Sequence, residues 1–122
     1  GIGMKKDTIL EIEKSIQNVY GWTVYDGEAK PPEMIMPQCA KDRIAHFWEF
    51  QEYGLSFLGC LKFILADDEE ECEKEFELGI GDDWLPPSDE FKLWRNRLLI
   101  MRELEVAAYL LYGPLSDKEE TQ

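Results

Sequence analysis

Apolar positions recur with helical spacing near the N-terminus. Thr8 and Glu11 fit a capping box, and apolar β-branched residues follow at spacings of three and four, at positions 9, 12, 16 and 19. This pattern predicts an amphipathic helix over residues 8–20 that ends at Gly21.

A longer helical pattern lies near the C-terminus. Ser88 or Asp89 is the expected cap, and an apolar ridge then runs without a polar break until Gly113-Pro114, where the helix is expected to stop. The ridge consists of Phe91, Trp94, Leu98, Met101, Leu104, Ala108 and Leu111. Further apolar residues flank it, so this helix should either cross the centre of the domain or meet a second copy of the chain.

Residues 43–66 allow two interpretations. One long helix fits a heptad-like spacing, whereas a hairpin fits the sequence Leu, Phe, Gly, Leu, Phe, Leu at every second position from 55 to 65. Gly54 and Gly59 would each weaken a helix by about 1 kcal/mol, and the aromatic density suits a pleated surface. The hairpin, with its turn near Tyr53-Gly54, is the preferred prediction.

The remaining segments are shorter. Residues 22–25 read as a strand closed by the turn pair Asp26-Gly27, and residues 28–37 read as a proline-rich loop with at best an edge strand at 33–36. Acidic residues from Asp67 signal a new helix start, which predicts a short acidic helix at 68–78. Its apolar anchors are Cys72, Phe76 and Leu78.

These elements predict an α+β fold. It consists of an N-terminal helix, a small antiparallel sheet of three or four strands, a short acidic helix and a long C-terminal helix packed on the sheet. An all-α bundle is the alternative. The length of 122 residues is typical of one domain. We place this domain at residues 4–115, with 1–3 as a cloning remnant and 116–122 as a flexible tail.

The charge balance restricts the possible partners. Asp and Glu number 26 against 13 Lys and Arg, for a net charge of −13. This charge argues against nucleic acid and against an anionic membrane surface, and it is compatible with a basic protein partner. Three cysteines without a C-x-x-C spacing and the absence of a signal-peptide pattern predict a reducing compartment, by default the cytoplasm.

The strongest compositional bias lies between residues 67 and 90, where twelve carboxylates accompany one lysine. A solvated face, a metal site and a docking surface are the three interpretations, and the EF-hand pattern is absent. Our leading hypothesis is a non-enzymatic binding module of the inhibitor or immunity type, which would hold a basic protein partner through an acidic surface. The expected contact residues are Glu70, Glu73, Glu77, Asp82 and Asp83, with Trp84 as an aromatic anchor.

The first alternative is a small-ligand binding protein or an enzyme. Its aromatic pocket would lie under the segment Met34–Met36 and would be lined by His46, Trp48, Phe50 and Phe57. Glu49 and Glu52 would be its acid–base couple, but no nucleophile motif supports catalysis, so no catalytic residue is assigned. No metal or cofactor is predicted, because the candidate zinc ligands lack a closely spaced pair; they are Cys39, His46, Cys60 and Cys72.

The second alternative is a homodimer through the helix Phe91–Leu111. Basic residues cluster in the first half of this helix, directly after the acidic stretch. They would form ion pairs either with the acidic helix of the same chain or across a dimer interface. These residues are Lys92, Arg95, Arg97 and Arg102.

Overall fold

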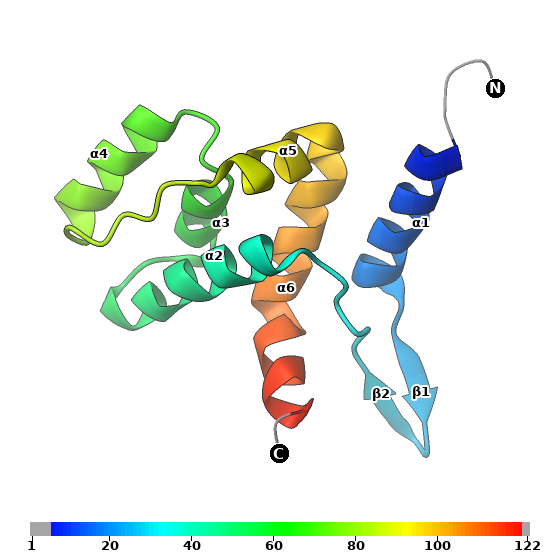
Figure 1. Ribbon diagram of the computed structural model, residues 1–122. Coiled ribbons are helices and arrows are strands. Elements are labelled where there is room, and N and C mark those ends of the chain that lie inside the picture. The colour runs from blue at the N-terminus through cyan, green and yellow to red at the C-terminus, as the bar shows by residue number, and fades with distance from the viewer. Residues whose placement is uncertain (1–5, 121–122) are drawn as a thin grey trace. The chain divides into compact units, whose positions relative to one another are not determined.

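The computed structural model describes residues 6–120, and it describes side chains for residues 6–111. Within these residues the chain forms six α-helices, a short 3₁₀ helix and a two-stranded antiparallel sheet (Figure 1). The chain divides into two compact units, one comprising residues up to Ile35 with those from Leu98 onward, and the other Met36–Arg97. The assignment of one domain to 4–115 stays a prediction, and the expected remnant at 1–3 lies outside the described residues.

The first unit contains two helices and a hairpin. Its elements are α1 (Lys6–Tyr20), β1 (Thr23–Tyr25), β2 (Glu28–Lys30) and α6 (Leu99–Glu120). The predicted N-terminal helix is confirmed, and the amide of Gly21 closes it by donating to the carbonyl of Gln17 at 2.9 Å. The helix begins before Thr8, so this residue lies inside α1 and is not its cap.

The buried face of α1 is polar. Ser15 and Asn18 are buried, whereas Ile9 and Ile16 of the predicted apolar stripe are 43% and 46% exposed. α1 packs against α6, where the buried carboxylate of Glu105 accepts from the Ser15 hydroxyl at 2.6 Å and from the Asn18 amide at 2.9 Å. Buried polar groups require such partners, so these bonds determine which face of α1 turns inward.

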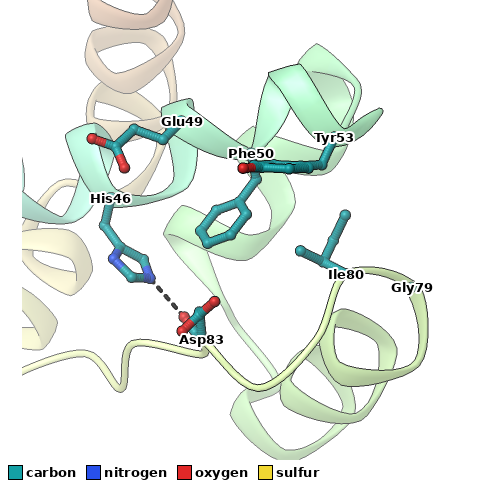
Figure 2. Close-up of a pocket in the computed structure, with 7 residues that line it drawn as sticks. All are labelled: His46, Glu49, Phe50, Tyr53, Gly79, Ile80 and Asp83. Atoms are coloured by element: carbon teal, nitrogen blue, oxygen red, sulfur yellow. Dashed lines mark hydrogen bonds between the residues drawn. The ribbon is translucent and has the colours of Figure 1, made fainter.

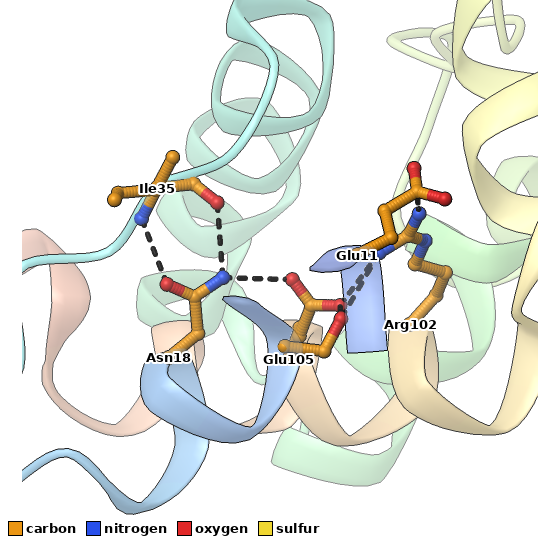
Figure 3. A network of polar contacts seen from close by, with 6 residues as sticks. Glu11, Asn18, Ile35, Arg102 and Glu105 are labelled. Carbon is orange, nitrogen blue, oxygen red and sulfur yellow. Dashed lines mark hydrogen bonds and ion pairs between the residues drawn. The ribbon is translucent and has the colours of Figure 1, made fainter. Parts of the chain in front are cut away.

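Three further residues, Arg102, Glu11 and Ile35, extend this network (Figure 3). Arg102 is buried and donates to Glu105 at 2.8 Å and to Glu11 at 3.1 Å. The side chain of Asn18 also bonds to both backbone groups of Ile35: its amide nitrogen donates to the carbonyl, and its oxygen accepts from the backbone N–H, each at 2.9 Å. The Asn18 amide therefore fixes the segment after β2.

The hairpin is the whole of the sheet within the described residues, so the prediction of three or four strands is wrong. β1 and β2 pair with Thr23 opposite Lys30. The turn pair was predicted correctly: Asp26 and Gly27 have φ of 53° and 79°, as a type I′ turn requires. β2 occupies residues expected to form a loop, and residues 33–36 form no strand.

The second unit is helical. Its elements are α2 (Gln38–Trp48), the 3₁₀ helix η1 (Glu49–Tyr53), α3 (Phe57–Leu65), α4 (Glu69–Gly79) and α5 (Asp89–Arg97). The predicted hairpin over residues 43–66 is therefore wrong. Gly54 does mark a chain reversal, but it ends η1 in the left-handed conformation at φ 96°, and Ser56 then caps α3 by accepting from the amide of Gly59 at 3.0 Å.

An aromatic cluster forms the core of this unit. The ring of Phe76 contacts four others, with centroid distances of 5.3–5.7 Å to Phe50, Phe47, Phe63 and Trp84. The acidic helix was predicted correctly: Asp68 caps α4 by accepting from the amide of Glu71 at 3.1 Å, and the anchors Cys72 and Phe76 are buried. The third expected anchor, Leu78, is 89% exposed.

The predicted C-terminal helix is two helices. Ser88 caps α5 through the amide of Phe91 at 3.1 Å, as expected, but the chain leaves helical geometry at Leu98 before α6 begins. α6 continues past Gly113-Pro114 to Glu120, so the predicted stop at this pair is wrong. Residues 116–120 of the expected tail are thus helical, and 121–122 lie outside the described residues.

Candidate functional site

A pocket of about 490 Å³ lies between one face of α2–η1 and the loop that follows α4. The helical wall is formed by His46, Glu49, Phe50 and Tyr53, whose spacing of three and four residues places them on one face. Gly79, Ile80 and Asp83 form the loop wall. Figure 2 shows the rings of Phe50 and Tyr53 on one side of the pocket and Ile80 with Asp83 on the other.

A hydrogen bond from His46 closes one end of the pocket. Its Nε2 lies 2.6 Å from the backbone carbonyl of Asp83 (Figure 2). A carbonyl oxygen only accepts, so Nε2 carries the hydrogen and, in the neutral ring, Nδ1 is the acceptor. The imidazole also packs edge-on against Phe47 and Phe50, at centroid distances of 5.0 and 5.5 Å. His46 thus orients the loop and is itself held in place.

Arg43, one helical turn before His46 on α2, binds the same loop. Its guanidinium donates to the carbonyl of Leu85 and lies over the ring of Trp84, 5.5 Å from the ring centroid. Burial, with a smaller contribution from nearby Arg95, lowers the pKa of Arg43 to about 10. The loop is therefore tied to α2 on both sides of Trp84, which places Asp83 at the pocket edge.

The aromatic part of the pocket rests on the core. Phe50 is half-buried and packs edge-on against Phe76, whereas Tyr53 is 74% exposed and lies 6.2 Å from Phe50 between centroids. One ring is therefore fixed from behind, and the other is open to solvent at the rim. Two exposed carboxylates, Glu49 and Asp83, complete the rim.

The acidic surface comprises five exposed carboxylates of α4 and its following loop: Glu70, Glu73, Glu77, Asp82 and Asp83. None of them forms an ion pair with any residue whose side chain the structure describes. The ion pairs of α4 involve its flanking positions instead, joining Glu75 to Lys62 at 2.5 Å and Glu69 to Lys92 at 3.1 Å. Lysines from other helices therefore pair with Glu69 and Glu75, whereas the outer face of α4 carries Glu70, Glu73 and Glu77 beside a single exposed cation, Lys74.

The pocket combines residues from two sites that the sequence analysis predicted separately. His46 and Phe50, from the expected ligand pocket, meet Asp83, from the expected partner surface. Trp48 and Phe57 do not line this pocket, and the lid role of Met34–Met36 stays a prediction. The predicted aromatic anchor, Trp84, is half-buried and packs against Phe47 and Phe63.

Glu49 was anticipated at the pocket as a carboxylate, but its expected partner Glu52 does not line it. Gly79 and Ile80 were missed. These two residues line the pocket only because the end of α4 lies against η1. The sequence of either segment alone does not predict that contact.

The basic residues of α5 and α6 serve internal contacts. Lys92 pairs with the acidic helix, as one interpretation expected. Arg95 instead donates to the backbone carbonyls of Leu65 and Ala66, at 2.8 and 3.2 Å. Neither Lys92 nor Arg95 forms an ion pair with the five carboxylates of the acidic surface.

The remaining chemistry is limited. Among residues 6–111, no three potential ligands gather as a metal site would require. The three cysteines form no disulfide, and burial raises the pKa of the Cys39, Cys60 and Cys72 thiols, which disfavours a nucleophilic thiolate. No helix in the described part of the chain has the length and apolar character needed to span a bilayer.

Comparisons of this chain with protein-family models, with curated proteins and with solved structures found no match.

Proposed function

We propose that this protein is a non-enzymatic binding module that holds a basic protein partner through the acidic surface of α4 and its following loop. The observation that carries the proposal is that five exposed carboxylates form no ion pair with any described side chain, in a unit where two other carboxylates of α4, Glu69 and Glu75, do. Inhibitor and immunity proteins are the functional class that fits such a surface.

The position of these charges supports a role in binding. Asp68, Glu69 and Glu70 lie at the N-terminus of α4, where negative charge stabilises a helix. Glu77 lies in the last turn, where the helix dipole is negative and no basic residue is present. A carboxylate there costs helix stability, so local folding does not explain it.

A charge-matched pair of variants tests the proposal. The triple variant Glu70→Gln, Glu73→Gln, Glu77→Gln removes three charges from the acidic surface, and Glu13→Gln, Glu28→Gln, Glu33→Gln removes three from exposed positions of the first unit. Binding to immobilised tetra-arginine, and capture of basic proteins from host lysate, should fall in the first variant only. Both should also weaken as salt rises. Equal binding by the two triple variants would overturn the proposal.

Self-association through the segment Phe91–Leu111 is a second candidate. It is favoured by five exposed apolar side chains in this segment, which are Leu93, Leu99, Ile100, Leu104 and Leu111. The net charge of −13 opposes contact between copies at low salt. Light scattering at low and high salt over a range of concentrations separates the two cases, and a monomer at the highest concentration in both salts excludes the dimer.

We place this activity in the cytoplasm. Three free cysteines, two of them buried, are compatible with a reducing compartment, where structural disulfides are rare.

A further inference from the structure

We infer that the pocket between α2–η1 and the loop after α4 binds an arginine side chain of the basic partner. This inference rests on the proposed function and specifies how the partner is recognised. The pocket adjoins the acidic surface, because Asp83 belongs to both.

The lining of the pocket suits a cation. It combines two exposed carboxylates, Glu49 and Asp83, with two aromatic rings, Phe50 and Tyr53, and contains no lysine or arginine. A cation close to an aromatic face gains about 0.5–2 kcal/mol, depending on how far it is desolvated. The surrounding negative charge also raises the local concentration of cations.

Arginine fits this lining better than other cations. A metal ion needs a convergent set of ligands, and the described residues contain none. A guanidinium is planar, so it stacks on an aromatic ring while its N–H groups fork toward a carboxylate; the compact ammonium of lysine does not combine these contacts. A volume of about 490 Å³ has room for the whole side chain.

The same unit already holds a guanidinium in this manner. The Arg43 group lies 5.0, 5.5 and 5.3 Å from the centroids of Phe47, Trp84 and Phe91. Internal carbonyls satisfy its N–H groups, whereas Glu49 and Asp83 would satisfy those of an incoming arginine.

Titration with short capped peptides, followed by amide NMR, tests the inference. Ac-Gly-Arg-Gly-NH₂ should shift the signals of Tyr53, Ile80 and Asp83 in a saturable manner. The lysine peptide should bind about three to fivefold more weakly, because it loses stacking, and the glutamine peptide should not bind.

Matched variants assign the effect to the pocket. Tyr53→Ala should weaken the arginine peptide about fivefold, the loss expected for one cation–π contact, and Tyr53→Phe should restore it. The control Tyr20→Ala removes a ring that is 69% exposed in the first unit and should change nothing. Likewise Glu49→Gln should weaken binding, whereas Glu52→Gln, one turn along but outside the lining, should not.

The outcomes separate this inference from the proposed function. If the Tyr53→Ala and Glu49→Gln variants bind the arginine peptide as well as the parent, the pocket inference is overturned, even where the α4 triple variant loses tetra-arginine. If the triple variant retains tetra-arginine while Tyr53→Ala weakens it, the pocket is supported and the acidic-surface proposal fails. Equal binding of the arginine and lysine peptides would overturn the assignment to arginine.

Discussion

Arg43 and Arg95 together donate hydrogen bonds to the four backbone carbonyls at the C-terminal end of α3. Arg43 donates to the carbonyls of Phe63 and Ile64 at 2.9 and 2.7 Å, and Arg95 donates to those of Leu65 and Ala66. A helix end leaves its last carbonyls unsatisfied and carries partial negative charge, so two guanidinium groups match it in hydrogen bonding and in electrostatics. Both arginines are buried, at 2% and 6% exposure.

Replacing Arg43 should therefore lower the free energy of unfolding of the second unit. Arg43→Lys keeps the charge but cannot reach three carbonyls and three rings from one planar group, and a stranded buried acceptor costs about 1–3 kcal/mol. We expect a loss of about 1–3 kcal/mol in the free energy of unfolding, measured with urea. The exposed control Lys74→Met should change it by less than about 0.5 kcal/mol. A loss below 1 kcal/mol for Arg43→Lys would contradict the capping role.

The sequence predicted the helices whose signals are local. The helix start signalled by the acidic residues from Asp67, the anchors Cys72 and Phe76, the cap at Ser88 and the Asp26-Gly27 turn depend on neighbours within four residues, and each is confirmed. The hairpin over residues 43–66 failed because the alternation from Leu55 to Leu65 overlaps a helical pattern. The buried residues of α3 are Cys60, Phe63 and Ile64, at spacings of three and four.

The chain reversal after α3 was beyond sequence reasoning. A left-handed residue at a helix end is usually glycine, but here Ala66 takes that conformation at φ 37°. Arg95, about thirty positions later in the chain, donates to its carbonyl, and no local pattern reports that contact. The hairpin prediction also hid the helical face of α2–η1 that forms one wall of the pocket, and the loop wall depends on tertiary contacts of Arg43 and His46.

The buried network of the first unit leads to a second prediction. Glu105 accepts from Ser15, Asn18 and Arg102, so Glu105→Gln places an amide donor among donors and leaves a buried guanidinium without its closest carboxylate. Breaking a buried ion pair from one side costs about 3–5 kcal/mol. Glu103→Gln, exposed two residues earlier on α6, is the matched control and should be nearly neutral in urea unfolding. Equal stability of the two variants would show that the network is dispensable.

Two glycines of the second unit should respond in opposite directions to alanine. Gly54 has φ 96°, so Gly54→Ala should destabilise by about 1–2 kcal/mol through backbone strain. Gly79 ends α4 without a positive φ, so Gly79→Ala should stabilise by about 0.4–1 kcal/mol by restricting the unfolded chain. An added Cβ meets nothing within 4 Å at either site, so packing does not confound the comparison. Thermal unfolding measures both, and shifts of the same sign would contradict the argument.

Stability should fall as the pH rises above about 9. Burial raises the pKa of Cys60 and Cys72 above the ordinary value of 9.0, so between the unfolded and folded pKa values the native state holds protons that the unfolded state has released. Stability from this source is complete below pH 9 and is lost as the pH rises through the folded pKa. Urea unfolding at several pH values should show the decline, and Cys60→Ala with Cys72→Ala should make it shallower. An unchanged slope would contradict the assignment.

Charge reversal on the acidic face of α4 should change helix stability in opposite directions at the two ends of the helix, but should weaken binding at both ends. Glu77→Lys places a cation in the last turn, where it suits the helix dipole, so it should stabilise by about 0.3–1 kcal/mol; Glu70→Lys places one in the first turn and should destabilise by a similar amount. Both reverse a charge of the acidic surface, so both should weaken salt-dependent binding to tetra-arginine. A more stable Glu77→Lys protein that binds less well would show that the carboxylate serves the partner and not the helix. If binding to tetra-arginine instead rose in the more stable variant and fell in the less stable one, both charges would affect binding only by changing the stability of the fold.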